Sequence, residues 1–289
     1  MSTDAVTAQP IEDLIGKSDE QLKKFEQLLT RFGIDFFEEN TEYIGSCPFC
    51  GGKFSMNKKT ALWRCFPEGI GGNTYDLIRR IHPFWLEKTT DAQRQDLIAL
   101  RKGAVDLEEL IDFEVAYNGV TNQWMIPAKS EEGSINNIYS WVEQWDHKTN
   151  EAYRQLMAAP SFFQMPYGLN RFRHTEHPVW IVEGHWDFLA FWGLLRRTNQ
   201  LHKFSVLGTP GTSFPQKWLS LLSGRPVITC FDNDEAGRKF TDSFAATLSR
   251  NMCNVKSLHH VAWPEGLPKG YDLSDVITSL PVGLRKKAG

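Results

Sequence analysis

The 289-residue sequence lacks the features of membrane and secreted proteins. It has no run of about 18 or more apolar residues, so no segment is predicted to span a bilayer. Its first residues, MSTDAVTAQPIEDLIG, lack a basic start followed by an apolar stretch, so no secretory signal is predicted. The expected location is therefore the cytoplasm.

The sequence also lacks a strong excess of charge of one sign. Its formal net charge is −3, which gives no global electrostatic argument for binding nucleic acid. The segment 46–102 differs, because its ten lysine and arginine residues outnumber its five acidic residues. This basic segment can attract phosphate groups, although an ordinary surface of mixed charge explains it equally well.

Cysteine is scarce, and three of the five cysteines lie close together. In a protein expected in the cytoplasm, this argues against disulfides. Cys47, Cys50 and Cys65 follow the pattern Cys-x2-Cys-x14-Cys, which makes them a candidate metal cluster. Cys230 lies in an apolar run and Cys253 near the end of a predicted helix, so both are expected to be small buried residues.

Hydrophobic patterning divides the chain into three blocks. The first, at about 18–84, starts with a helix capped by Ser18 and continues with short strands around the cysteines. The second, at about 91–172, combines a helix with a hairpin that turns at Glu132-Gly133-Ser134. The third, at about 178–280, alternates four β-rich runs with helical segments, among them FPQKWLSLL. This alternation predicts a mainly parallel sheet covered by helices.

In the third block, acidic residues follow two of the predicted strands. Glu183 ends the run VWIVE, and Asp232 and Asp234 end the run PVITCFD. Ligands of parallel α/β sheets bind at the carboxyl ends of the strands, so these carboxylates are expected on one rim. Such oxygen ligands suit Mg²⁺ or Mn²⁺, which bind substrate phosphates in their remaining positions. The alternative is that the acids only cap helix N-termini.

The segments VWIVEGHWDFLAF and VITCFDNDEAGRKF resemble the two signature motifs of the Toprim domain. That domain occurs in DnaG-type primases, type IA and type II topoisomerases, RecR-like recombination proteins and some nucleases. The resemblance implies that Glu183 is a metal ligand or a general acid/base. It also implies that Asp232 and Asp234 are the metal-binding pair.

Three further acidic residues follow from the same resemblance. Asp187 matches a frequent acidic position in the helix after the motif glutamate. The segment GYDLSDVI, with Asp272 and Asp275, is similar to a later acidic segment of primases. The resemblance implies that these residues supply additional Mg²⁺ contacts. For Asp272 and Asp275, a helix N-terminal cap is an equally good explanation.

The cysteine segment resembles the zinc-ribbon domain that binds template in primases. The resemblance implies Zn²⁺ at Cys47, Cys50 and Cys65, and the last ligand of the family falls on Glu68. Carboxylate oxygen binds Zn²⁺ but is rarer in structural sites, so a ribbon without tight metal binding is the alternative. An aromatic ring among cations can grip single-stranded DNA, and the candidates are Trp63, Arg64 and Lys58. Trp63 could equally pack the core of the ribbon.

The segments WMIPAKSEEGSINNIYSW and MPYGLNRF resemble the small basic subdomain of DnaG-type primases and phage primase-helicases. In that family the subdomain completes the polymerase site. The resemblance implies that cations of this region hold the nucleotide or the template. The candidates are Arg154, Arg171 and Arg173, with Lys129 as a weaker one. Each could also be an ordinary surface charge.

The combined interpretation is an α/β protein whose Toprim domain, a Rossmann-like and mainly parallel sheet, spans 176–280. The preceding parts are an N-terminal helical segment at 1–40, a zinc-ribbon β domain at 41–86 and a small α+β subdomain at 87–175. The subdomain corresponds to the N-terminal part of the primase polymerase core. A tail at 281–289 ends the chain.

This organisation implies a DNA primase that makes short RNA primers on single-stranded DNA from ribonucleoside triphosphates, with Mg²⁺ and Zn²⁺ as cofactors. The sequence lacks the phosphate loop G-x-x-x-x-G-K-[ST]. A replicative helicase is therefore expected as a separate chain, and a phage or mobile-element origin is a further hypothesis. The alternatives are a Toprim metal-dependent nuclease and a non-catalytic RecR-like DNA-binding module. The block 91–172 argues against the module, and a topoisomerase would need a further domain.

Overall fold

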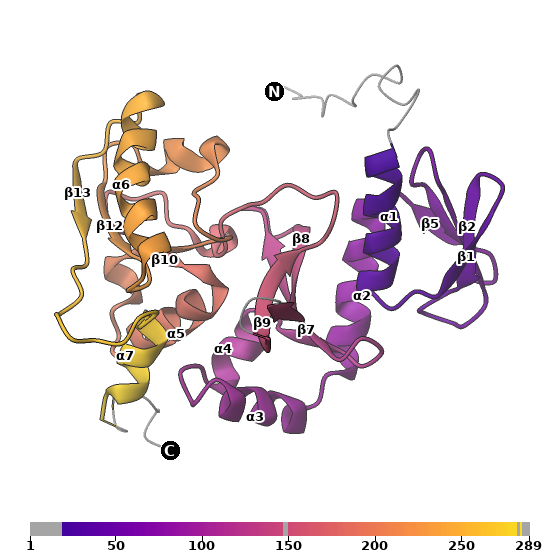
Figure 1. Cartoon of the computed structure of the whole chain (residues 1–289), viewed down its shortest axis with the longest axis horizontal. Helices are drawn as coiled ribbons and strands as arrows, with labels where there is room; N and C mark the ends of the chain where they lie inside the picture. Colours follow the sequence, from indigo (N-terminus) through magenta and orange to yellow (C-terminus); the bar gives the residue numbers. More distant parts are fainter. Residues whose placement is uncertain (1–18, 147–149, 282–283, 285–289) are drawn as a thin grey trace.

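The computed structural model describes residues 19–146, 150–281 and 284. Figure 1 shows its three β-sheets in a row, with the middle sheet between the N-terminal and C-terminal parts. The predicted helix cap at Ser18 and most of the predicted tail lie outside the described residues. Among the described helices, none is both long enough and apolar enough to cross a bilayer.

The first sheet is antiparallel, and its five strands follow one another in sequence order. Its strands are β1 (Phe36–Glu39), β2 (Glu42–Ser46), β3 (Lys53–Asn57), β4 (Trp63–Cys65) and β5 (Ile70–Gly72). Two helices, α1 (Asp19–Arg31) and α2 (Thr74–Lys88), pack beside it. Phe25 and Leu28 in α1, and Phe32 directly after it, recur at helical spacing and are buried in the core of this sheet. Asn73 caps α2.

The middle sheet is also antiparallel and follows two short helices, α3 (Asp91–Leu100) and α4 (Leu107–Asp112). Its strands are β6 (Ala116–Asn118), β7 (Gln123–Lys129), β8 (Ile135–Asp146) and β9 (Glu151–Ala158). The predicted hairpin is confirmed, because β7 and β8 pair around the turn that contains Gly133. One hydrophobic cluster joins this sheet to α2, and another joins it to α5 (Gly184–Arg197).

The third sheet is parallel, as predicted, and has the strand order β11-β10-β12-β13. Its strands are β10 (Val179–Glu183), β11 (Ser205–Thr209), β12 (Pro226–Cys230) and β13 (Ser257–His260). Helices α5 and α7 (Leu273–Ser279) contribute to one core, whereas α6 (Glu235–Arg250) contributes to the other. The segment FPQKWLSLL, predicted to be helical, contains the 3₁₀ helix η4 (Gln216–Leu222) after Pro215.

A buried ionic network ties the middle part of the chain to the third sheet. Arg197 on α5 contacts Asp106 at 2.8 Å and Glu109 at 3.4 Å, and Arg196 contacts Glu109 at 2.6 Å. The side chains of Arg197 and Glu109 are 5% and 1% exposed. Their charges are therefore removed from water and depend on one another.

We expect Arg197→Ala to lower the free energy of unfolding by about 3 kcal/mol, because it leaves a buried carboxylate short of a partner. Thermal and urea unfolding would measure the change. Arg250→Ala, at an exposed position of α6, is the matched control and should have little effect. An unchanged unfolding midpoint for Arg197→Ala would show that the network does not hold the two parts together.

Candidate metal-dependent active site

The acidic rim begins where β10 passes directly into α5. Glu183 is the last residue of β10, and Gly184 starts the helix with a φ of +78°, in the left-handed region that favours glycine. Glu183 Oε2 accepts a hydrogen bond of 3.1 Å from the backbone N–H of Asp232. The two segments that carry the predicted acids are therefore in direct contact.

The topology explains why these two strand ends meet. β10 and β12 are neighbours at the centre of the sheet, and the helices that follow them, α5 and α6, belong to cores on opposite faces. This is a topological switch point, where the loops after the strands separate and leave a crevice. Glu183 and Asp232 lie at the carboxyl ends of these two strands.

The second acidic motif is a tight turn that opens α6. Asp234 is the N-cap of α6, and its Oδ1 accepts a hydrogen bond of 2.7 Å from the N–H of Gly237. A Cβ atom on residue 237 would lie 2.2 Å from the backbone oxygen of Asp232. Glycine is required here because the helix approaches the turn so closely. Asp234 therefore caps the N-terminus of α6, as the alternative explanation predicted, whereas Asp232 does not cap this helix.

A cleft of about 320 Å³ brings most of the predicted acids together. It lies between the rim of the third sheet and strands β8 and β9 of the middle sheet. Four acidic residues line it, namely Glu183, Asp187, Asp232 and Asp272. Asp275 lies outside this cleft and lines a neighbouring cavity of about 230 Å³, together with Asp272.

Asp187 has a structural duty that its sequence position does not reveal. It is 4% exposed, and its carboxylate accepts hydrogen bonds from the backbone N–H groups of Leu273 (3.0 Å) and Ser274 (3.1 Å). Both donors belong to the first turn of α7, so Asp187 fixes this helix against α5. Asp272 and Asp275 form a capping box at the same helix start, as their alternative explanation predicted.

Burial and mutual repulsion weaken the acidity of the rim. Burial, followed by the charges of four acidic neighbours, raises the pKa of Asp232 to about 9. Burial, followed by the charge of Asp272, raises the pKa of Asp187 to about 7. Burial is also the main reason why the pKa of Glu183 is raised. A hard divalent cation would relieve this repulsion, so the donor set fits an ion bound by oxygen ligands.

The structure adds two cations to the rim that the sequence analysis missed. Arg101, at the end of α3, lines the acidic cleft, and its guanidinium lies 5.2 Å from the ring centre of Trp186. Arg101 and Lys102 both line the adjoining cavity beside Asp272. Their approach depends on how the end of α3 and the helix α7 lie around one cavity, so no local motif could have revealed it.

The four predicted cations of the middle part differ in position. Arg154 lines the acidic cleft, 5.1 Å from the ring centre of Trp141. The others lie outside the cleft lining: Arg171 bonds the backbone oxygen of Asp112 at 3.4 Å, Arg173 is exposed, and Lys129 pairs with Glu114. The structure thus brings only Arg154 to the acids.

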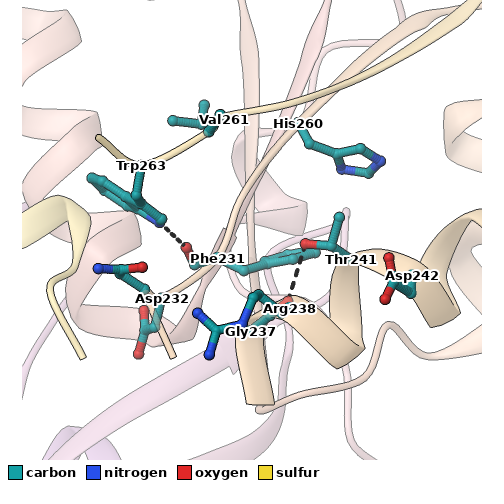
Figure 2. Close-up of a pocket in the computed structure, with 11 residues that line it drawn as sticks. Phe231, Asp232, Gly237, Arg238, Thr241, Asp242, His260, Val261 and Trp263 are labelled. Atoms are coloured by element: carbon teal, nitrogen blue, oxygen red, sulfur yellow. Dashed lines mark hydrogen bonds between the residues drawn. The ribbon is translucent and has the colours of Figure 1, made fainter. Parts of the chain in front are cut away.

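A further cavity, of about 410 Å³, adjoins the turn of Asp232 between α6 and the end of β13. Figure 2 shows Arg238 and Trp263 facing this space together with Asp232. Trp263 Nε1 donates a hydrogen bond of 2.7 Å to the backbone oxygen of Phe231. The carboxylate of Glu183 accepts a hydrogen bond from the backbone N–H of Asp232. The peptide group between Phe231 and Asp232 is therefore held by two hydrogen bonds, one at its oxygen and one at its nitrogen.

The predicted cysteine cluster forms. The ligand atoms of Cys47, Cys50 and Cys65 all lie within 4.8 Å of one another. A tight turn brings the first two together, because the backbone oxygen of Cys47 accepts a hydrogen bond of 2.8 Å from Gly51. Burial raises the pKa of the Cys47 thiol to about 12. Three converging sulfur atoms form a donor set suited to a soft or borderline metal such as zinc.

Two expectations about this first sheet are corrected by the structure. Glu68 is exposed on the turn between β4 and β5 and is not a member of the cysteine cluster. Trp63 is 3% exposed, packs on Phe54 and donates a hydrogen bond to Asn73, so its ring is not accessible to a base. Lys58 is paired with Glu38.

An accessible aromatic ring close to the cysteine cluster is that of Phe66, which directly follows Cys65 and is 47% exposed. Lys53 lies 5.2 Å from its ring centre and Arg64 lies 5.4 Å from it. Of the three predicted template-gripping residues, only Arg64 therefore accompanies an exposed ring. The alternation of side chains along β4 explains why Arg64 is accessible and Trp63 is not. Trp63 and Cys65 face the core, whereas Arg64 faces outward.

Comparison with known proteins agrees with this architecture. The sequence model of the Toprim-like family matches residues 180–277. The uncharacterized protein MG010 of Mycoplasma genitalium is 25% identical over 117 residues, which are 40% of this chain and 51% of that protein. The chain thus spans about half the length of this curated relative.

Solved structures resemble the larger part of the chain. A DnaG catalytic core gives a TM-score of 0.53 at 17% identity, covering 70% of this chain and 74% of that one. The E. coli primase catalytic core gives 0.52 at 17% identity, covering 71% and 75%. A DnaG primase catalytic domain bound to single-stranded DNA gives 0.51 at 18% identity, covering 70% and 76%.

At 17–18% sequence identity, the similarity to the solved structures is a similarity of fold. The family match covers the parallel sheet from β10 to α7, including both acidic strand ends. Residues 180–277 are therefore a Toprim-like domain, set within the fold of the DnaG primase catalytic core.

Proposed function

We propose that this chain is a DNA primase, a nucleotidyltransferase that synthesises short RNA primers on single-stranded DNA. The observation that carries the proposal is the cleft in which Glu183, Asp187, Asp232 and Asp272 meet Arg101 and Arg154. Carboxylates that hold cations, next to arginine side chains, suit a substrate made of several phosphate groups. The fold shared with primase catalytic cores supports the same choice.

The reaction joins the 3′-oxygen of the growing primer to the α-phosphorus of a ribonucleoside triphosphate, and pyrophosphate leaves as the bond between the α- and β-phosphates breaks. We assign Asp232, Asp234 and Glu183 to metal binding, with Mg²⁺ or Mn²⁺ as the ion. When bound, the ion neutralises charge that develops on the phosphates. Asp272 is an additional candidate ligand, and Asp187 supports it by holding the start of α7.

The chain's own residues also orient the substrates. Glu183 holds the turn of Asp232, and its raised pKa makes it a suitable acceptor for the proton of the 3′-hydroxyl. Arg154 and Arg101 flank the acids and would bind the phosphates of the nucleotide. Arg171, Arg173 and Lys129 would contact the template outside the cleft.

The cysteine cluster completes the proposal. Cys47, Cys50 and Cys65 would hold Zn²⁺ and keep the first sheet in the shape that presents the template. The exposed group of Phe66, Arg64 and Lys53 is the surface of this sheet best suited to a nucleic-acid strand. The replicative helicase would be a separate partner chain.

Incubation with single-stranded DNA of mixed sequence, Mg²⁺ and labelled ribonucleotides tests the proposal. Short labelled RNA is expected with the wild-type chain and not with Asp232→Ala. Omitting the DNA serves as a second control, because primer synthesis depends on a template. Shortened DNA without RNA synthesis would replace the primase assignment with the nuclease alternative. An Asp232→Ala variant with full synthesis would refute the assigned site.

A further inference from the structure

A cavity of about 330 Å³ lies away from the acids, where three parts of the chain meet. Helix α2, the start of β8, the segment after β9 and the 3₁₀ helix η4 each contribute side chains to it. None of its eight lining residues is acidic. This composition contrasts with the acidic cleft, which contains four carboxylates.

Two cations give the cavity its charge. Arg79 on α2 donates hydrogen bonds of 3.0 Å to the backbone oxygen of Ile135 and to Asn136 Oδ1. These bonds fix its guanidinium without neutralising it, because both acceptors are uncharged. Lys217 enters from η4 and is exposed. Within the described part of the chain, neither cation has a carboxylate partner within 4.0 Å.

Three aromatic rings line the same cavity, namely Tyr75, Phe163 and Trp218. Phe163 is 80% exposed although its backbone oxygen is held by Asn137 at 2.9 Å. An aromatic ring presented to water from a fixed backbone is a ready stacking surface. Lys217 lies 5.3 Å from the ring centre of Trp218, so cation and ring are adjacent here too.

We propose that this cavity, the Arg79–Lys217 site, binds single-stranded nucleic acid outside the acidic cleft. Its cations would hold backbone phosphates, and Phe163 and Trp218 would stack on unpaired bases. Duplex DNA suits the site less well, because its bases are already stacked on one another. The choice of ligand rests on the proposed function, since a primase must hold a template strand. The binding chemistry itself needs no catalysis.

Binding of a fluorescent twelve-nucleotide oligo-dT to the full chain, followed by anisotropy, tests the site. The test uses the Asp232→Ala background, so that no synthesis occurs. Phe163→Ala and Lys217→Glu remove a ring and reverse a charge at exposed positions, so both variants should fold. Phe163→Ala is expected to weaken binding about tenfold, the order found for a lost stacking contact, and Lys217→Glu is expected to weaken binding through a lost phosphate contact. Lys217→Glu should also flatten the salt dependence by the equivalent of about one phosphate contact.

Matched controls separate the site from general surface effects. Trp145→Ala removes another half-exposed ring, and Arg250→Glu reverses another exposed charge. Both are expected to change the affinity less than twofold. Equal weakening by the site variants and the controls would overturn the proposal. So would unchanged affinity in both site variants.

The outcomes distinguish this inference from the proposed function. Primer synthesis by the wild-type chain with unchanged binding in the site variants would refute the Arg79–Lys217 site alone. Site-dependent binding without any synthesis would support the site and refute the primase assignment.

Discussion

Replacing Asp232 with asparagine is expected to abolish primer synthesis and, in the metal-free protein, to increase thermal stability. Asparagine keeps the shape of the side chain but removes a charge that binds the cation. Loss of one such electrostatic contribution to the reaction typically costs about a hundredfold to a thousandfold in rate. Activity is measured as labelled RNA formed at saturating Mg²⁺ and nucleotide. Asp96→Asn, on the exposed face of α3, is the matched control.

The gain in stability follows from the raised pKa of Asp232, about 9, against an ordinary value of about 3.9. Between these two values the folded state binds more protons than the unfolded state, so the stability of the metal-free wild type falls as the pH rises through this window. At pH 8, Asp232→Asn should therefore raise the free energy of unfolding by about 1–3 kcal/mol, since one pKa unit corresponds to about 1.4 kcal/mol.

Addition of Mg²⁺ should make the wild type more stable than Asp232→Asn, the reverse of the metal-free proteins. The wild type gains stability from the bound ion, whereas Asp232→Asn gains much less because it has lost a ligand. Thermal unfolding at pH 6 and pH 8, with Mg²⁺ or with a chelator, measures both effects. If the metal-free wild type were more stable at pH 8 than at pH 6, the repulsion inferred at the rim would not control stability.

Replacing Cys65 with serine is expected to remove the bound metal and to unfold the first sheet. Cys65 is fully buried, and its Sγ lies 3.5 Å from that of Cys50. In small zinc domains, metal binding supplies about 10–16 kcal/mol of apparent folding free energy, so one lost ligand can release the domain. Metal analysis should find about one zinc ion per wild-type chain. Limited proteolysis should cut the variant within 36–72.

Two further variants give this experiment its controls. Cys253→Ser alters a cysteine outside the cluster and should retain zinc, since serine can keep the hydrogen bond to the backbone oxygen of Leu219. Glu68→Ala should also retain zinc, because Glu68 is exposed and outside the cluster. Zinc loss from Glu68→Ala would restore Glu68 as a ligand. A wild-type chain that binds no zinc would remove the metal from the proposal.

The sequence by itself determined the parallel sheet and its acidic strand ends. Strands and helices are periodic over a few residues, and parallel topology forces the ends of neighbouring strands to one edge. Glu183 and Asp232 therefore met as predicted, 49 residues apart in the chain. The cysteine cluster was equally predictable, because Cys47 and Cys50 share one turn and Cys65 lies on a nearby strand.

Only the tertiary structure decided which of the remaining candidates reach the sites. Arg101 approaches the rim because the end of α3 and the start of α7 line one cavity, whereas Lys129 is held elsewhere by Glu114. Asp187 looks like a metal ligand in the sequence, but its carboxylate is bonded to the start of α7. Trp63 is turned into the core. Burial and ion pairing depend on segments far apart in the chain, so local patterns reveal the type of a side chain but not its partners.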